Sequence, residues 1–112
     1  MNIATMTRTA AEVTDALNAV HVNGTHDEDV APLAQEAHFF WEAPIGSTLR
    51  VFACLALMDG TCGLTIDVRD RHEETVDTFG AVAADEDLTA ATIAAHIARA
   101  VALATVGRPI AF

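Results

Sequence analysis

Two histidines and three consecutive acids gather in the stretch HVNGTHDEDV, residues 21–30. Imidazole and carboxylate groups bind zinc and act as general acids and bases, so His21, His26 and Asp27 would be the residues of a metal-dependent enzyme. The spacing of the two histidines across an Asn-Gly turn is not a recognised zinc spacing. The three acids also lack the alternation and the glycine of a calcium loop. We therefore expect a solvated acidic loop here, with no metal and no cofactor.

The other candidate groups form no catalytic pattern. The sequence contains no G-x-S-x-G, P-loop or G-x-G-x-x-G motif. Cys54 and Cys62 fall in predicted strands without a neighbouring cation that would activate a thiolate. A non-catalytic protein is therefore favoured, and an enzyme remains the alternative.

Two helices are predicted at the ends of the chain, and the first of them is amphipathic. In residues 9–21 the apolar side chains recur at helical spacing, opposite polar ones. A longer helix is predicted over residues 88–106, with Asp87 as its N-cap and Gly107 just past its end.

The middle of the chain is typical of antiparallel strands. Residues 37–43, 48–57 and 62–69 are rich in aromatic and β-branched side chains and are separated by turn sequences. Residues 74–80 are a plausible fourth strand. The sequence thus predicts one α+β domain over residues 1–112, an antiparallel three- to four-stranded meander flanked by an N-terminal and a C-terminal helix.

The turn at Asp59-Gly60 sets the register of the second predicted hairpin. It pairs four apolar residues with four others on one face: Leu57 with Cys62, Leu55 with Leu64, Ala53 with Ile66 and Val51 with Val68. The same register puts Cys54 and Cys62 on opposite faces, which rules out a disulfide between them. Both are therefore expected to be reduced thiols, as in the cytoplasm.

A turn centred on Ile45-Gly46 would set the register of the first hairpin. It places Phe39 opposite Phe52 and Trp41 opposite Arg50, while Arg50 lies opposite Arg69. Opposed arginines repel each other, so other groups must offset their charges. The candidates are stacking of Trp41 on Arg50, pairing of Asp67 or Glu74 with Arg69, and an external anion. The predicted binding surface comprises Phe39, Trp41, Arg50, Phe52 and Arg69.

Two interpretations of this surface stay open. Either a helix or the arginine stems cover the aromatic side chains, or the face binds something. In the second case it binds a protein partner, or it is a small-molecule or anion-binding module that uses Trp41, Arg50 and Arg69.

The last predicted helix carries a second unusual feature. Ala91, Ala95, Ala98 and Ala102 form a stripe of small residues opposite the expected core stripe, and Arg99 is the only charge between residues 88 and 106. A helix that is apolar all round is usually buried. It packs either against the first helix as well as the sheet, or against a second copy of the chain in a homodimer.

Composition narrows the classes of function. The 112 residues carry a net charge of -10 and contain six arginines and no lysine. This balance disfavours nucleic acid and anionic membranes and favours a basic partner. No apolar run is long enough to span a membrane, and no secretory signal is expected at the start. The preferred function is a small acidic protein-binding or accessory protein of inhibitor, immunity, phage-accessory or chaperone type, which acts by occupying a partner's surface.

Overall fold

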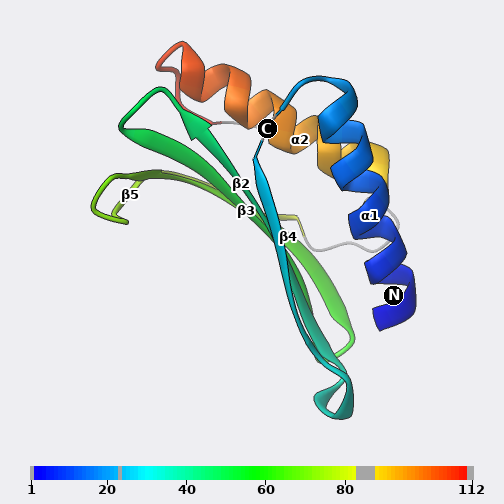
Figure 1. The fold of residues 1–112 in the computed structure, drawn as a ribbon. Coiled ribbons are helices and arrows are strands. Elements are labelled where there is room, and N and C mark those ends of the chain that lie inside the picture. Colours follow the sequence, from blue (N-terminus) through cyan, green and yellow to red (C-terminus); the bar gives the residue numbers. More distant parts are fainter. Residues whose placement is uncertain (1, 23, 83–87, 111–112) are drawn as a thin grey trace.

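The structure, a computed structural model, describes residues 2–22, 24–82 and 88–110. Within these ranges it has the predicted α+β architecture, with two α-helices and one five-stranded antiparallel sheet (Figure 1). The elements in chain order are α1 Ile3–Ala19, β1 Thr25–Ala31, the short 3-10 helix Pro32–Ala34, β2 Glu36–Ile45, β3 Leu49–Met58, β4 Thr61–Asp70, β5 Thr75–Val82 and α2 Ala90–Thr105. The strands also lie side by side in chain order, from β1 to β5.

The strand β1 is the main departure from the predicted elements. The sequence predicts a solvated acidic loop here, but residues 25–31 form a strand although Asp and Glu are poor strand formers. All seven of them pair with β2, so the neighbouring strand overrides the low propensity. The predicted fourth strand is present as β5, and the sheet therefore has five strands rather than three or four.

Local capping decides where the helices begin. α1 starts at Ile3, six residues earlier than predicted, because the Asn2 side chain accepts a hydrogen bond from the Thr5 amide at 2.8 Å. Thr89 caps α2 in the same way; the predicted cap Asp87 lies outside the described residues. At the other end, Gly107 has a φ of +71° and ends α2 as predicted. Neither helix of the described ranges is long and apolar enough to cross a membrane.

Both helices lie on one face of the sheet, which we call the inner face (Figure 1). The core lies between the helices and this face. Its fully buried side chains include Met6 and Val13 of α1, Ile93 and Ile97 of α2, and Leu55, Leu64 and Ile66 of the sheet. The opposite, outer face of the sheet carries neither helix.

The predicted register of the β3–β4 hairpin is confirmed. Leu57 lies opposite Cys62, and the other three predicted pairs follow at every second position. Cys62 is buried in the core on the inner face, whereas Cys54 lies on the outer face. Both cysteines are among the described residues, and neither forms a disulfide.

The predicted register of the β2–β3 hairpin is wrong. The strands are joined by the three residues after Ile45, which lies opposite Leu49, and Phe39 faces Leu55 instead of Phe52. This shift of three positions turns every side chain of β2 to the other face, because side chains alternate along a strand. Phe39 and Trp41 are therefore core residues, 0% and 5% exposed, and Phe40 takes their place on the outer face.

Candidate functional site

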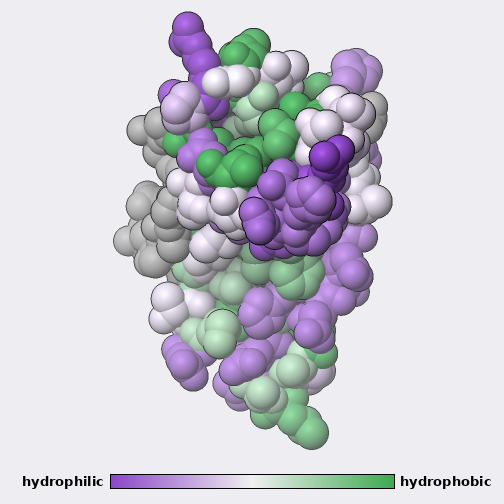
Figure 2. All heavy atoms as spheres, turned by 90° about the vertical axis from the view of Figure 1, so that its left-hand side faces the viewer, coloured by the Kyte–Doolittle hydropathy of each residue, from purple (hydrophilic) through white to green (hydrophobic). Residues whose placement is uncertain are grey.

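A row of aromatic side chains crosses the outer face of the sheet. The rings of His38 and Phe40 are stacked with 6.1 Å between their centres, and Phe40 lies 5.6 Å from Phe52. The Arg69 guanidinium covers the end of the row, 3.9 Å from the centre of the Phe52 ring. We call His38, Phe40 and Phe52 the aromatic row. Figure 2 views the molecule from the side of the outer face and shows hydrophobic and hydrophilic side chains next to one another there.

The aromatic row is half-buried, not enclosed. His38, Phe40 and Phe52 are all of intermediate exposure, while their strand neighbours on the inner face are buried. Alternation along β2 and β3 produces this difference, since the helices cover only one face. Of the predicted binding surface, the outer face keeps Arg50, Phe52 and Arg69 and loses Phe39 and Trp41.

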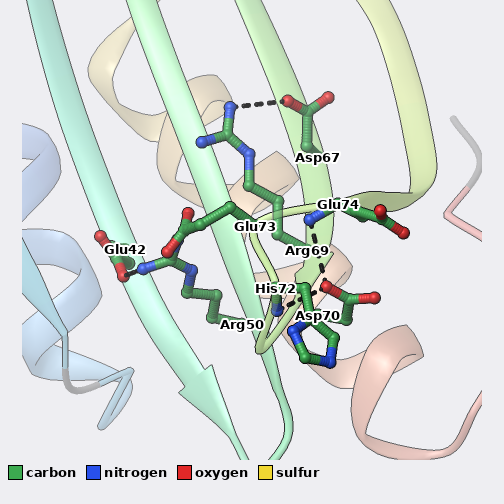
Figure 3. A network of polar contacts seen from close by, with 8 residues as sticks. All are labelled: Glu42, Arg50, Asp67, Arg69, Asp70, His72, Glu73 and Glu74. Atoms are coloured by element: carbon green, nitrogen blue, oxygen red, sulfur yellow. Dashed lines mark hydrogen bonds and ion pairs between the residues drawn. The ribbon is translucent and has the colours of Figure 1, made fainter.

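The two opposed arginines are neutralised within the chain (Figure 3). Arg50 lies directly opposite Arg69, as predicted. Arg50 forms ion pairs with Glu42 and Glu73, and Arg69 pairs with Asp67 at 3.3 Å. Asp67 was one of the partners expected for Arg69, whereas the expected stacking of Trp41 on Arg50 is wrong because Trp41 faces the core.

The predicted anion-binding set is therefore not assembled. Trp41 lies on the opposite face of the sheet from Arg50 and Arg69. The Arg50 guanidinium already forms ion pairs with the carboxylates of Glu42 and Glu73. Its buried Nε atom has no hydrogen-bond partner among the described residues. An external anion would have to compete with these internal carboxylates.

The histidines of the opening stretch are separated by the fold. His21 lies in an exposed turn after α1, whereas His26 faces inward from β1. There its Nδ1 lies 3.0 Å from the Thr14 hydroxyl and its ring meets Trp41 edge-on. Asp27, the next residue of the strand, points to the outer face. No group of three or more His, Cys, Asp or Glu residues that could hold a metal ion occurs in the described part of the chain.

Cys54 lies on the outer face, opposite Phe40 across the two strands. Burial, and after it the nearby Asp67 carboxylate, raise the pKa of its thiol to about 11, while Arg69 partly offsets both effects. A thiol of this pKa is protonated at neutral pH and is a poor nucleophile.

The alanine stripe of α2 lies partly at the surface. α2 packs against α1 and the sheet through its core stripe. Ala91, Ala95 and Ala102 remain exposed, whereas Ala98 is half-buried and packs on the core. The structure thus leaves three of these four residues accessible to a second copy.

Sequence reasoning missed Phe40, His38 and the acidic strand beside them. A signal was available in residues 37–43, since His38 and Glu42 alternate with Phe40 and mark the wetter face of the strand. For β1 the sequence offered no comparable signal, because its apolar content is too low to show alternation.

Comparison of the chain with protein-family models, with curated protein sequences and with solved structures found no match. Function is therefore inferred from the outer face itself.

Proposed function

We propose that this protein is a small acidic, non-catalytic binding protein that acts by covering a partner protein's surface with the outer face of its sheet. The observation that supports this proposal is the aromatic row, which lies half-exposed on a sheet face that neither helix covers. Aromatic side chains at the centre of an accessible patch, with charged residues around them, are typical of protein interfaces. Arg50 and Arg69 lie at the edge of this patch.

The surrounding charge favours a basic partner and disfavours nucleic acid. The chain has a net charge of -10, and both arginines of the outer face are already paired with carboxylates. We also propose a cytoplasmic location, in keeping with two cysteines that form no disulfide. The exposed alanines of α2 support a homodimer as a second, separate contact.

Affinity capture with matched variants tests the proposal. Phe40→Ala removes the centre of the aromatic row, and Leu33→Ala removes a fully exposed apolar side chain outside it. A stoichiometric partner retained by the wild type and by Leu33→Ala should be lost with Phe40→Ala, provided circular dichroism shows that the variant is folded. Identical partners for all three proteins would contradict the proposal.

A further inference from the structure

The strand β1 offers an unpaired edge beside the aromatic row. β1 is the first strand of the sheet and pairs only with β2 among the described strands. Its pairing covers all seven residues without a register shift, and six of the seven are exposed. A regular edge of this kind presents main-chain N–H and C=O groups to an incoming strand.

Two contacts hold β1 in place. His26, the second residue of β1, has its Nδ1 3.0 Å from the Thr14 hydroxyl, so the strand is tied to α1. At the start of the strand, Gly24 lies so close to β2 that a Cβ atom would come 2.1 Å from the Glu42 carbonyl oxygen. The edge is therefore formed before any partner arrives, which lowers the entropy cost of binding.

The other edge of the sheet is less suited to strand addition. β5 pairs with β4 through two irregularities in register. The main chain near the C-terminus also lies against it, since the Ile110 amide donates to the Asp77 carboxylate at 2.6 Å. This comparison favours β1 as the docking edge.

A groove of about 270 Å³ lies on the outer face next to β1. Its lining includes Phe40, Phe52 and Asp27, together with Glu42, whose carboxylate also pairs with Arg50. Aromatic faces and carboxylates together suit a guanidinium, which stacks on a ring and bonds to carboxylate oxygens. Arg69 already shows this stacking within the chain, 3.9 Å from the centre of the Phe52 ring.

The charge of β1 also selects against a second copy. Asp27, Glu28 and Asp29 form no ion pair among the described residues, and the same three acids would meet one another if two β1 edges paired. Asp27 and Asp29 lie directly opposite Phe40 and His38, so both flank the aromatic row. An arginine side chain on a strand added to β1 would reach both these carboxylates and the aromatic row.

We infer that the partner docks as an extended, arginine-bearing segment that adds a strand to the free edge of β1 and places an arginine side chain in the groove beside Phe40. This inference rests on the proposed function, because it assigns the chemistry of the partner for the same face. Main-chain hydrogen bonds would supply the register and the arginine would supply the selectivity.

A synthetic peptide of alternating arginine and valine, seven residues long to match β1, tests the inference by NMR titration. The amide signals of residues 25–31 should shift with saturation. The same peptide N-methylated at every residue has the same charge but has no main-chain N–H to donate, and it should lose these shifts. A glutamate–valine peptide should not bind.

Matched protein variants test whether the negative charge of β1 contributes to binding of the arginine peptide. Asp27→Asn with Asp29→Asn should weaken binding of the arginine peptide by about tenfold, since each lost charge contact costs a factor of a few. Glu12→Gln with Asp15→Asn removes the same charge from the exposed side of α1 and should leave the affinity within about twofold.

Three results would overturn the inference: no shift at β1, equal binding of the N-methylated peptide, or equal loss with both charge variants. The proposed function fails separately. If Phe40→Ala abolishes capture of a cellular partner while the arginine peptide does not bind β1, the outer face is a binding surface and the strand-addition mode is wrong.

Discussion

The Trp41 indole Nε1 donates a hydrogen bond to the Thr14 hydroxyl at 2.9 Å, which ties the second strand of the sheet to the first helix. The Thr14 hydroxyl also donates to the Ala10 carbonyl and lies 3.0 Å from the Nδ1 atom of His26, so it links α1, β1 and β2. Trp41 is 5% exposed and belongs to the core. Trp41 therefore stabilises the fold through its burial and this hydrogen bond.

We expect Trp41→Ala to lower the free energy of unfolding by about 3–5 kcal/mol, as for other core aromatic residues. Thr14→Val should cost about 1–3 kcal/mol, because it leaves a buried indole N–H without its acceptor. The double variant Thr14→Val with Trp41→Phe should lose less stability than the sum of the two single variants, as measured by urea denaturation. Additive effects would show that the hydrogen bond does not form.

Phe39 and Phe40 provide a direct test of the register of β2. Phe39 is fully buried on the inner face, and Phe40 is half-buried on the outer face. Phe39→Ala should therefore cost about 3–5 kcal/mol of stability and Phe40→Ala distinctly less. Urea denaturation of both variants measures the difference, and the reverse order of stability would restore the register predicted from the sequence.

Gly24 should not tolerate a side chain. A Cβ atom at this position would lie 2.1 Å from the Glu42 carbonyl oxygen, so the main chain of β1 would have to move away from β2. Gly24→Ala is expected to cost about 2 kcal/mol or more. Gly46→Ala is the control, because its Cβ meets nothing within 4 Å and only the φ of +61° opposes it, at about 1–2 kcal/mol. Hydrogen exchange at residues 25–31 should rise in Gly24→Ala alone.

Cys54 should be slow to react in the folded protein. Its pKa is raised from 9.0 to about 11, and a difference of two units lowers the thiolate fraction at pH 8 about 100-fold. Alkylation by iodoacetamide, followed by mass spectrometry, should accelerate with pH toward this value. Because the folded pKa lies above the unfolded one, the thiol's contribution to stability is complete below pH 9.0 and is lost as the pH rises through about 11. Rapid alkylation of Cys54 at pH 8 in the native protein would contradict this.

The homodimer is best tested at Ala95. Ala98 packs on the core, so a charge there would destabilise the subunit itself, whereas Ala95 is exposed. Ala95→Glu should reduce the dimer seen by light scattering because the new carboxylate would lose its hydration in the contact. The Tm of the subunit should stay nearly constant. Ala19→Glu, at an exposed alanine of α1, is the control, and a monomeric wild type at high concentration would rule the dimer out.

Local sequence determined the class of fold and one of its hairpins. The turn at Asp59-Gly60 and the alternation on either side of it specify the same pairing of β3 with β4, so a single register satisfies both. The helical periodicity of the two ends is equally local, and Ala10, Val13 and Leu17 fall on the core face as their spacing requires.

Only the tertiary structure decided which face of β2 is buried and whether β1 is a strand. In residues 37–43, Phe40 shares a face with the polar His38 and Glu42, so alternation gives only a weak signal, and the three-residue turn after Ile45 sets the register. The acidic residues of β1 have no intrinsic preference for a strand and pair because β2 offers a free edge and His26 reaches Thr14. Phe39 and Trp41 are buried because α1 and α2 cover their face of the sheet, and β1 is a strand because it pairs with β2, so both outcomes depend on tertiary contacts that no local pattern contains.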